Sequence, residues 1–213
     1  MLKAILSDFD GTLVTKDILD VVCGITGNEE NSRRISEEFH SGLRTGINDT
    51  IIPRINFLKG VSLQQIESKL NENNYLLPGA EALFDYLKKN NIVTILHSGN
   101  ILPVLKYYQK ILDIDYVLGT RPQMNGDKIV GITPADFPTE ANFKVVWVNK
   151  LLKELGINPN ETLSIGDAPS DRSLFELSGR SIAVNPHDGI EKYATHVIHN
   201  DLNKAIPIIS QYL

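Results

Sequence analysis

The chain has only one cysteine, Cys23, among its 213 residues. A single cysteine excludes an internal disulfide framework and favours a cytoplasmic location. We expect Cys23 to be a small buried side chain rather than a nucleophile, because no histidine lies near it in the sequence. No apolar run reaches the roughly 18 residues that a membrane span needs, so we expect no membrane partner.

The chain also has little excess of positive charge. There are 21 Lys and Arg against 26 Asp and Glu, a formal net charge of −5, and no basic block, so we expect no nucleic-acid partner. One Lys precedes Asp8, which does not resemble a signal peptide. With 42% hydrophobic and 22% charged residues, the composition is typical of a globular protein with one sizeable domain, with or without a smaller inserted one.

Short apolar runs alternate with helix-like stretches along the chain. This pattern predicts an α/β fold with a doubly wound, mostly parallel sheet and a Rossmann-like core. A helix is predicted from Pro78-Gly79 to Lys89, and another ends at Gly156. Asn125-Gly126 predicts a hairpin turn. The predicted strands are residues 4–6, 93–96, 116–118, 163–165, 182–184 and 197–198.

The segment between the first and second predicted strands has a different character. It contains no convincing strand and reads as helices over residues 31–43, 47–58 and 62–71, with a capping-box pattern at the start of the last. Connections between strands are usually short. We therefore predict a small helical cap, residues 14–78, inserted into a core formed by residues 1–13 and 79–213.

Polar residues recur where predicted strands end. Asp8 follows the first strand, Ser98 the second and Asp167 the fourth, so parallel neighbouring strands would bring them to one crevice. Asp10 and Asp171 bring the number of carboxylates there to four, which repel one another unless a cation is present. Oxygen ligands without His or Cys suit Mg²⁺, which commonly binds phosphate oxygen as well. The sequence thus predicts a Mg²⁺ site and a phosphate-bearing substrate.

The remaining residues of the crevice suit phosphoryl transfer. Ser98 offers a hydroxyl donor, Gly99 allows backbone N–H groups to approach an anion, and Lys144 can neutralise negative charge. Asp8 could act as the nucleophile. Asp10 could protonate the leaving alkoxide and then deprotonate water.

Several of these residues also have structural interpretations. Asp171 could cap a helix that begins near Arg172. Lys150 and Lys153, on the same predicted helix, are alternatives to Lys144. His97, at a strand end beside the site, is more often structural than catalytic.

The segments "DFDGT", "HSGN" and "GDAPSD", with Lys144 before the last, resemble the four motifs of the haloacid dehalogenase superfamily of phosphatases. The resemblance implies that Asp8 is the nucleophile and Asp10 the general acid and base. It implies that Asp8, Asp167 and the Asp10 backbone carbonyl bind Mg²⁺, with Asp171 a direct or more distant member of the metal site. The phosphoryl group would be held by Ser98 and Lys144.

Within the superfamily the chain resembles the phosphoserine phosphatase-like branch. Asp17 stands where that branch has a Glu that meets the substrate ammonium, and Arg54 in "PRINFLKG" matches an Arg that binds the substrate carboxylate. Asn100 and Ser170 depart from the Gly and Asn of that branch. Asp17 could instead be a helix N-terminal charge, and Arg54 a surface residue or part of a salt bridge within the cap. The substrate-binding set implied is Asp17, Arg54, Ser98, Gly99 and Asn100.

We therefore expect a Mg²⁺-dependent phosphatase that acts on a small phosphorylated metabolite, with phosphoserine as the leading substrate. Another small metabolite phosphate, such as an enol-phosphate of methionine salvage, remains an alternative. A phosphomutase and a non-catalytic phosphate-binding protein also remain open, as does the choice between a monomer and a homodimer.

Overall fold

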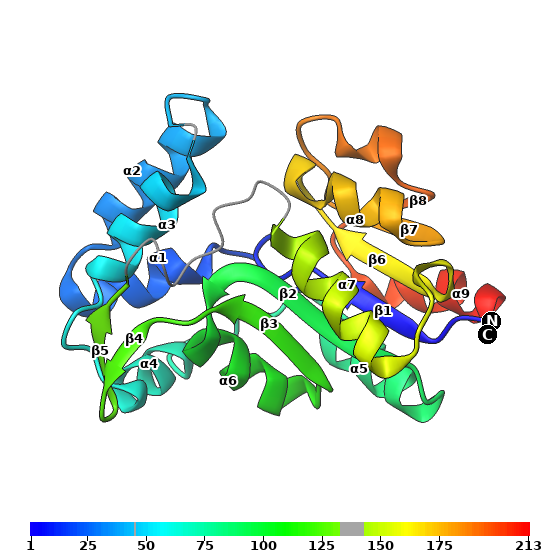
Figure 1. Cartoon of the computed structure of the whole chain (residues 1–213), viewed down its shortest axis with the longest axis horizontal. Coiled ribbons are helices and arrows are strands. Elements are labelled where there is room, and N and C mark those ends of the chain that lie inside the picture. Colours follow the sequence, from blue (N-terminus) through cyan, green and yellow to red (C-terminus); the bar gives the residue numbers. More distant parts are fainter. Residues whose placement is uncertain (45, 133–142) are drawn as a thin grey trace.

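The computed structural model describes residues 1–44, 46–132 and 143–213 and contains a parallel β-sheet flanked by helices (Figure 1). Six strands of the described residues form this sheet in the order β3-β2-β1-β6-β7-β8, and every neighbouring pair is parallel. The predicted doubly wound sheet is therefore confirmed. Its strands are β1 (Ala4–Ser7), β2 (Val93–Ile101), β3 (Tyr116–Thr120), β6 (Thr162–Gly166), β7 (Arg180–Val184) and β8 (His196–Ile198).

Helices cover both faces of the sheet because successive residues of a strand point to opposite sides. In β1, Ile5 belongs to the apolar cluster that contains Leu83, whereas Leu6 packs with Val148. One face is covered by α5 (Ala80–Lys89), α6 (Leu102–Leu112) and α9 (Ala205–Ile209), and the other by α7 (Phe143–Leu155) and α8 (Arg172–Leu177).

Among the described residues, four α-helices lie between β1 and α5, at the end of the molecule opposite both chain termini (Figure 1). The three predicted cap helices are present with ends shifted by a few residues, and α1 was anticipated only through the interpretation of Asp17 as a helix N-terminal charge. Ile18 and Val22 of α1 share one apolar cluster with Leu83 of α5, so these helices and the sheet have a continuous core. The division at residues 14–78 stays a prediction. The helices are α1 (Ile18–Cys23), α2 (Glu29–His40), α3 (Ile47–Asn56) and α4 (Leu63–Leu70).

Local hydrogen bonds fix two of these cap helices. At the start of α4 the Gln65 N–H donates to Ser62 Oγ (3.2 Å), and the Ser62 N–H donates to Gln65 Oε1 (3.0 Å), which confirms the predicted capping box. Pro53 lies inside α3 and cannot donate to the carbonyl of Asp49. Arg44 Nη1 donates to that carbonyl instead (3.1 Å), so the acceptor keeps a partner.

A hairpin follows the sheet strand β3. It consists of β4 (Gln123–Asn125) and β5 (Lys128–Gly131), which are antiparallel. Because Asn125 pairs with Lys128, the two loop residues are Gly126 and Asp127. The predicted hairpin is confirmed, but the turn lies one residue later than Asn125-Gly126. Gly126 has a φ of +61°, a conformation that glycine adopts at little cost.

The hairpin also binds the cap. The Gly60 N–H donates to the Ile129 carbonyl (2.7 Å), and the Ile129 N–H donates to the Val61 carbonyl (2.9 Å). The segment before α4 therefore adds a short antiparallel pairing to β5. This pairing fixes one side of the cap to the core.

Strand β2 bulges where it reaches the site. His97 pairs with Leu118 and Ile101 with Thr120, so residues 98–100 of β2 lie opposite a single residue of β3. Bulges redirect side chains at strand ends. The prediction that Ser98 follows the strand was wrong, because it lies within β2, in this bulge.

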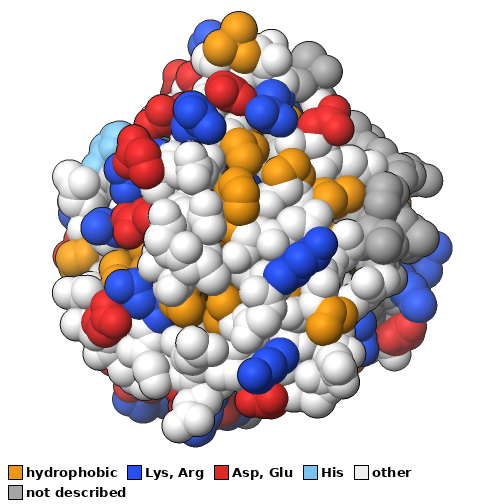
Figure 2. All heavy atoms as spheres, turned by 90° about the vertical axis from the view of Figure 1, so that its left-hand side faces the viewer, with side chains coloured by type: hydrophobic (Ala, Val, Ile, Leu, Met, Phe, Trp, Pro, Cys, Tyr) orange, Lys and Arg blue, Asp and Glu red, His pale blue; other side chains and the backbone are white. Residues whose placement is uncertain are grey.

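In the described part of the chain no helix is long and apolar enough to span a bilayer. On the face that carries the cap, acidic and basic side chains are interspersed, with small apolar groups between them (Figure 2). That mixture differs from the single-sign field that attracts nucleic acid.

Candidate active site

The carboxyl ends of β1, β2 and β6 meet at a cavity of about 180 Å³. These strands are parallel neighbours, as the sequence analysis assumed. A larger groove of about 430 Å³ lies between α4 and α6 and is lined by other residues. Of the residues predicted for the site, Asp8, Asp10, Asp17, Arg54, Ser98, Gly99, Asn100 and Lys144 line the smaller cavity.

Lys144 joins two of the predicted carboxylates. Its Nζ lies 2.7 Å from Oδ1 of Asp8 and 2.7 Å from Oδ1 of Asp171, and all three residues are buried. Burial alone would lower the pKa of Lys144, but the two carboxylates raise it above its ordinary value. The ammonium is therefore charged at neutral pH. Lys150 and Lys153 are exposed on the same helix, α7.

Asp8 directly follows β1 and lines the cavity. Burial raises the pKa of its carboxyl well above the usual value, the charges of Asp171 and Asp167 raise it further, and Lys144 lowers it. Oδ1 accepts the hydrogen bond from Lys144. Among the described residues no donor reaches Oδ2, so this oxygen is available to react.

Both carboxyl oxygens of Asp171 have partners. Oδ1 accepts from Lys144, and Oδ2 accepts from the backbone N–H groups of Asp167 (3.1 Å) and Ala168 (3.3 Å). The side chain thus closes the short 3₁₀ turn Pro169–Asp171, and it makes no capping hydrogen bond to α8. Asp171 thus occupies the N-cap position of α8 as the alternative interpretation had it, but its side chain does not cap that helix.

Asp167 directly follows β6. Its Oδ1 accepts from Thr12 Oγ1 (3.1 Å), and its Oδ2 lies 3.3 Å from Nε2 of His187. Burial, followed by the charge of Asp171, raises the pKa of Asp167. Sequence reasoning gave His187 no role, and only its contact with Asp167 reveals its place beside the site.

Two sets of side chains could hold a divalent cation. Asp8, His97 and Asp171 have potential ligand atoms within 4.8 Å of one another, but Lys144 Nζ is bonded to both of these carboxylates and would repel a cation. Asp8 and Asp167 instead offer oxygen ligands, which suit a hard ion such as Mg²⁺. Burial raises the pKa of Asp8, the charges of Asp171 and Asp167 raise it further, and a cation bound beside Asp8 would offset this rise.

Two glycines that the sequence analysis did not single out make room for these carboxylates. A Cβ on Gly11, which has a φ of +79°, would overlap the carboxylate of Asp167. A Cβ on Gly166 would overlap the carboxylate of Asp171. The available signal is that each glycine adjoins a site aspartate in the sequence, Gly11 after Asp10 and Gly166 before Asp167.

The carboxyl group of Asp10 accepts hydrogen bonds from three sides. Oδ1 accepts from the Ile18 N–H at 2.8 Å, and Oδ2 lies 3.1 Å from Nδ2 of Asn100 and 3.4 Å from Oγ of Ser98. Burial raises the pKa of Asp10 to about 7, and the charge of Asp17 adds to this, although the hydrogen bonds lower it. A carboxyl group with such a pKa can both donate and accept a proton near neutral pH.

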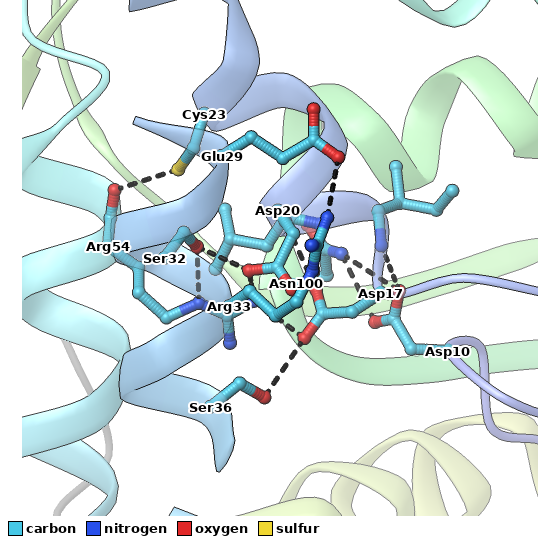
Figure 3. Close-up of polar contacts among 12 residues, drawn as sticks. Asp10, Asp17, Asp20, Cys23, Glu29, Ser32, Arg33, Ser36, Arg54 and Asn100 are labelled. Carbon is cyan, nitrogen blue, oxygen red and sulfur yellow. Dashed lines mark hydrogen bonds and ion pairs between the residues drawn. The ribbon is translucent and has the colours of Figure 1, made fainter. Parts of the chain in front are cut away.

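Arg54 of α3 is buried in an ion-pair network inside the cap (Figure 3). Its Nη2 lies 2.6 Å from Asp17 Oδ2 and 2.9 Å from Asp20 Oδ1, and its Nε donates to Ser32 Oγ at 2.9 Å. The alternative of a salt bridge within the cap is therefore realised, and Arg54 also lines the cavity. The alternative of a solvated surface residue was wrong.

Asp17 has the predicted position of a helix N-terminal charge, and its contact with the substrate ammonium stays a prediction. It is the N-cap of α1, where Oδ1 accepts from two backbone N–H groups of the first turn (3.0 and 3.3 Å), and its Oδ2 faces Arg54 in the cavity. Asp20 and Ser32 were missed. The spacing i, i+3 between Asp17 and Asp20 was a usable signal, because such residues share one helix face.

An apolar wall faces the carboxylates. Phe39, Ile51 and Phe143 line the cavity together with Ser170. A Cβ on Gly99 would meet Ile51 and Phe143 only at ordinary contact distance, 3.8 Å, so the space at this position does not demand glycine. The anion-approach role of Gly99 stays a prediction.

His97 is buried beside Asp8. Its Nδ1 lies 3.8 Å from Asp8 Oδ1, and neither ring nitrogen has a hydrogen-bond partner among the described residues. Burial and the charge of Lys144 lower the pKa of His97 to about 3, so the ring is neutral at pH 7. A neutral, buried ring behind Asp8 agrees with the structural interpretation.

Comparison with known proteins agrees with this arrangement of strand-end carboxylates. The family model of haloacid dehalogenase-like hydrolases matches residues 5–176, and the chain belongs to this family. The superfamily resemblance read from the motifs is therefore confirmed.

More particular similarities point to one branch of the family. The phosphoserine phosphatase of Methanocaldococcus jannaschii is 28% identical over 183 residues, covering 85% of this chain and 84% of the relative. That of Campylobacter jejuni subsp. doylei is 25% identical, covering 98% of this chain and all of the relative, 100%. A solved structure described as a phospho-aspartyl intermediate analogue of phosphoserine phosphatase has a TM-score of 0.83 and 26% identity, covering 97% of this chain and 98% of that one.

Proposed function

We propose that the protein is a Mg²⁺-dependent phosphatase that hydrolyses a small phosphomonoester, foremost phosphoserine, through an aspartyl-phosphate on Asp8. The observation that carries this proposal is the Asp8 carboxylate at the end of β1, with Oδ1 bonded to Lys144, Oδ2 without a donor among the described residues, and Asp10 two residues further on. Relatives named phosphoserine phosphatase support the same chemistry. So does a structural neighbour described as a phospho-aspartyl analogue.

Asp8 and Asp167, together with the backbone carbonyl of Asp10, would hold Mg²⁺, which when bound supplies positive charge beside the phosphoryl group. The residues fit the ion because burial and the neighbouring charge of Asp171 raise the pKa of both carboxyls. We assign Asp171 to the positioning of Lys144, because both of its oxygens already accept hydrogen bonds.

In the first step Oδ2 of Asp8 attacks phosphorus and forms a P–O bond. The bond from phosphorus to the ester oxygen breaks, and protonated Asp10 gives its proton to the departing alkoxide. Lys144 and the hydroxyl of Ser98 stabilise the negative charge on the phosphoryl oxygens.

In the second step a water molecule attacks the phosphorus of phospho-Asp8. Asp10, now a carboxylate, takes a proton from this water, and the bond from phosphorus to Asp8 breaks. Inorganic phosphate leaves, and both aspartates return to their starting protonation states. The pKa of Asp10, about 7, suits both proton transfers near neutral pH.

The cap end of the cavity would recognise the amino-acid part of phosphoserine. Arg54 Nη1 donates to no described residue and would bind the substrate carboxylate, while Asp17 would face the ammonium. Because Asp17 and Asp20 already contact Nη2, Arg54 offers the substrate carboxylate Nη1 rather than two unoccupied nitrogens side by side. The cavity of about 180 Å³ favours a small ester.

Phosphate release from a panel of esters tests this proposal. The panel contains L-phosphoserine, phosphothreonine, phosphoglycolate, sugar phosphates and p-nitrophenyl phosphate, each with Mg²⁺ and with a chelator. Asp8→Asn removes the nucleophile, and Asp85→Asn is a matched control because Asp85 is exposed on α5.

We expect Mg²⁺-dependent release that is fastest with phosphoserine, absent in Asp8→Asn and unchanged in Asp85→Asn. A different preferred ester with the same dependence on Asp8 would keep the mechanism and reject phosphoserine as the substrate. Turnover by Asp8→Asn at the wild-type rate would reject the aspartyl-phosphate.

A further inference from the structure

Asn100 stands in the β2 bulge, and its side chain is directed at Asp10 (Figure 3). It is buried, with 3% of its surface exposed. Its Nδ2 lies 3.1 Å from Oδ2 and 3.3 Å from Oδ1 of Asp10. The amide thus contacts both oxygens of the carboxyl group that the proposed mechanism uses for proton transfer.

The orientation of this amide is fixed by its other contacts. The Ile101 N–H donates to Asn100 Oδ1 at 2.8 Å, and the Asn100 N–H donates to Ser98 Oγ at 3.0 Å. Because Oδ1 faces a backbone donor, the NH₂ group must face the carboxyl of Asp10. The side chain is therefore a donor to Asp10, held by the start of α6.

The remaining donors to Asp10 constrain it unequally. Oδ1 accepts a short hydrogen bond of 2.8 Å from the Ile18 N–H. Apart from Asn100, the only donor to Oδ2 among the described residues is the Ser98 hydroxyl, at 3.4 Å. With this one short hydrogen bond alone, the carboxyl plane could still rotate about the Cβ–Cγ bond. The amide of Asn100 supplies the second point that fixes the plane.

We propose that Asn100 is a positioning residue that holds the carboxyl group of Asp10 in the orientation needed for proton transfer. This inference rests on the proposed phosphatase function. It gives Asn100 a different task from the substrate contact implied by the sequence motif, because its acceptor is used by Ile101 and its donor by Asp10. The role concerns the leaving group, not substrate affinity.

The leaving group therefore distinguishes this role from a merely structural one. A serine-like alkoxide is strongly basic and needs a proton as it departs, whereas p-nitrophenolate is weakly basic and needs little help. The ratio kcat/KM reports steps up to the first irreversible one, here formation of phospho-Asp8. Misorienting Asp10 should lower kcat/KM for an alkyl phosphate and leave that for p-nitrophenyl phosphate nearly unchanged.

Two variants separate the donor from the acceptor of Asn100. Asn100→Ala removes both functions. Asn100→Asp keeps an oxygen for the Ile101 N–H but cannot donate to Asp10. Asn31→Asp on the exposed face of α2 controls for the added charge.

The experiment measures kcat/KM of the wild type and the three variants on the best alkyl ester of the panel and on p-nitrophenyl phosphate. We expect both Asn100 variants to lose about 10- to 100-fold on the alkyl ester, with little change on the aryl ester. With p-nitrophenyl phosphate the two Asn100 variants should also show a burst of nitrophenolate, because the second step, hydrolysis of phospho-Asp8, still needs Asp10 to activate water. Asn31→Asp should match the wild type.

Equal losses on both esters, or wild-type behaviour of Asn100→Asp beside an impaired Asn100→Ala, would overturn the positioning role alone. In either case the side chain merely supports the start of α6. Absence of turnover by the wild type on every ester would overturn the proposed function itself, and the assignment of Asn100 with it.

Discussion

Replacing Arg54 by Met should destabilise the protein far more than removal of an exposed arginine. The Arg54 side chain is 4% exposed, and those of its partners Asp20 and Asp17 are 9% and 30% exposed. Removing one member of a buried ion pair typically costs about 3 to 5 kcal/mol, because the remaining charge has no partner. Since Asp17 is partly solvated, we expect about 3 kcal/mol, which lowers Tm by roughly 6 to 12 °C in a chain of this size.

Thermal and urea unfolding of purified variants measure this loss. Arg33→Met is a matched control, because Arg33 is 46% exposed and its pairs with Glu29 and Glu30 lie on the surface of α2. Such surface pairs contribute about 0 to 1 kcal/mol. The double variant Arg54→Met with Asp20→Asn should recover at least about 1 kcal/mol, because it removes the uncompensated charge.

The reasoning is refuted if Arg54→Met is no less stable than Arg33→Met, or if Asp20→Asn brings no recovery. The same variants show why a loss of activity in an Arg54 variant does not by itself reveal substrate recognition. An activity comparison at this position needs Arg54→Lys, which keeps a charge, and p-nitrophenyl phosphate, which has no carboxylate.

Three further changes have defined outcomes. Gly11→Ala should weaken Mg²⁺ binding in calorimetry because its Cβ overlaps the carboxylate of Asp167, which we propose as a ligand, whereas Gly27→Ala, with a φ of +73° and open space around it, should bear only the backbone strain and bind normally. Lys144→Met should lower kcat by roughly 10²- to 10³-fold, as the loss of one charge-stabilising donor does, while the exposed Lys150→Met should leave it unchanged. Asp10 binds more protons in the folded protein than in the unfolded chain between pH 4 and 7, because burial raises its pKa from 3.8 to about 7. His97, whose pKa burial lowers to about 3, contributes with the opposite sign. In urea titrations of metal-free protein, the free energy of unfolding should therefore fall more steeply with rising pH in the wild type than in Asp10→Asn, and Mg²⁺ at pH 7 should restore stability.

Local patterns predicted the carboxylates of the core well. Asp8 and Asp167 each follow a short buried strand, and strand and aspartate are read from adjacent residues. Their meeting required only that these strands be parallel neighbours, which the sheet order confirms. The capping box at Ser62 was equally predictable, because its two partners lie three residues apart.

The parts that were not predicted depend on contacts between distant segments. Arg54, Asp20 and Ser32 come from three different helices, so the sequence spacing could relate Asp20 to Asp17 but could not show that Arg54 and Ser32 meet them. The bulge that turns Asn100 toward Asp10 arises from the register of β2 against β3. The sequence predicted residue types at the site, but which donor meets which acceptor is set by tertiary packing.

The attachment of the cap divides it into two parts with different freedom to change. Residues 60–63 pair with the hairpin strand β5, and α4 packs against α6 of the core. The side chains that line the cavity from α2 and α3, Phe39 and Ile51 among them, lie outside these two contacts, although α3 also touches β2 and β5. Substrate range can therefore diversify by substitution on α2 and α3 while α4 and the hairpin keep the cap attached. Variant libraries aimed at new esters should vary α2 and α3 and leave α4 and the hairpin constant.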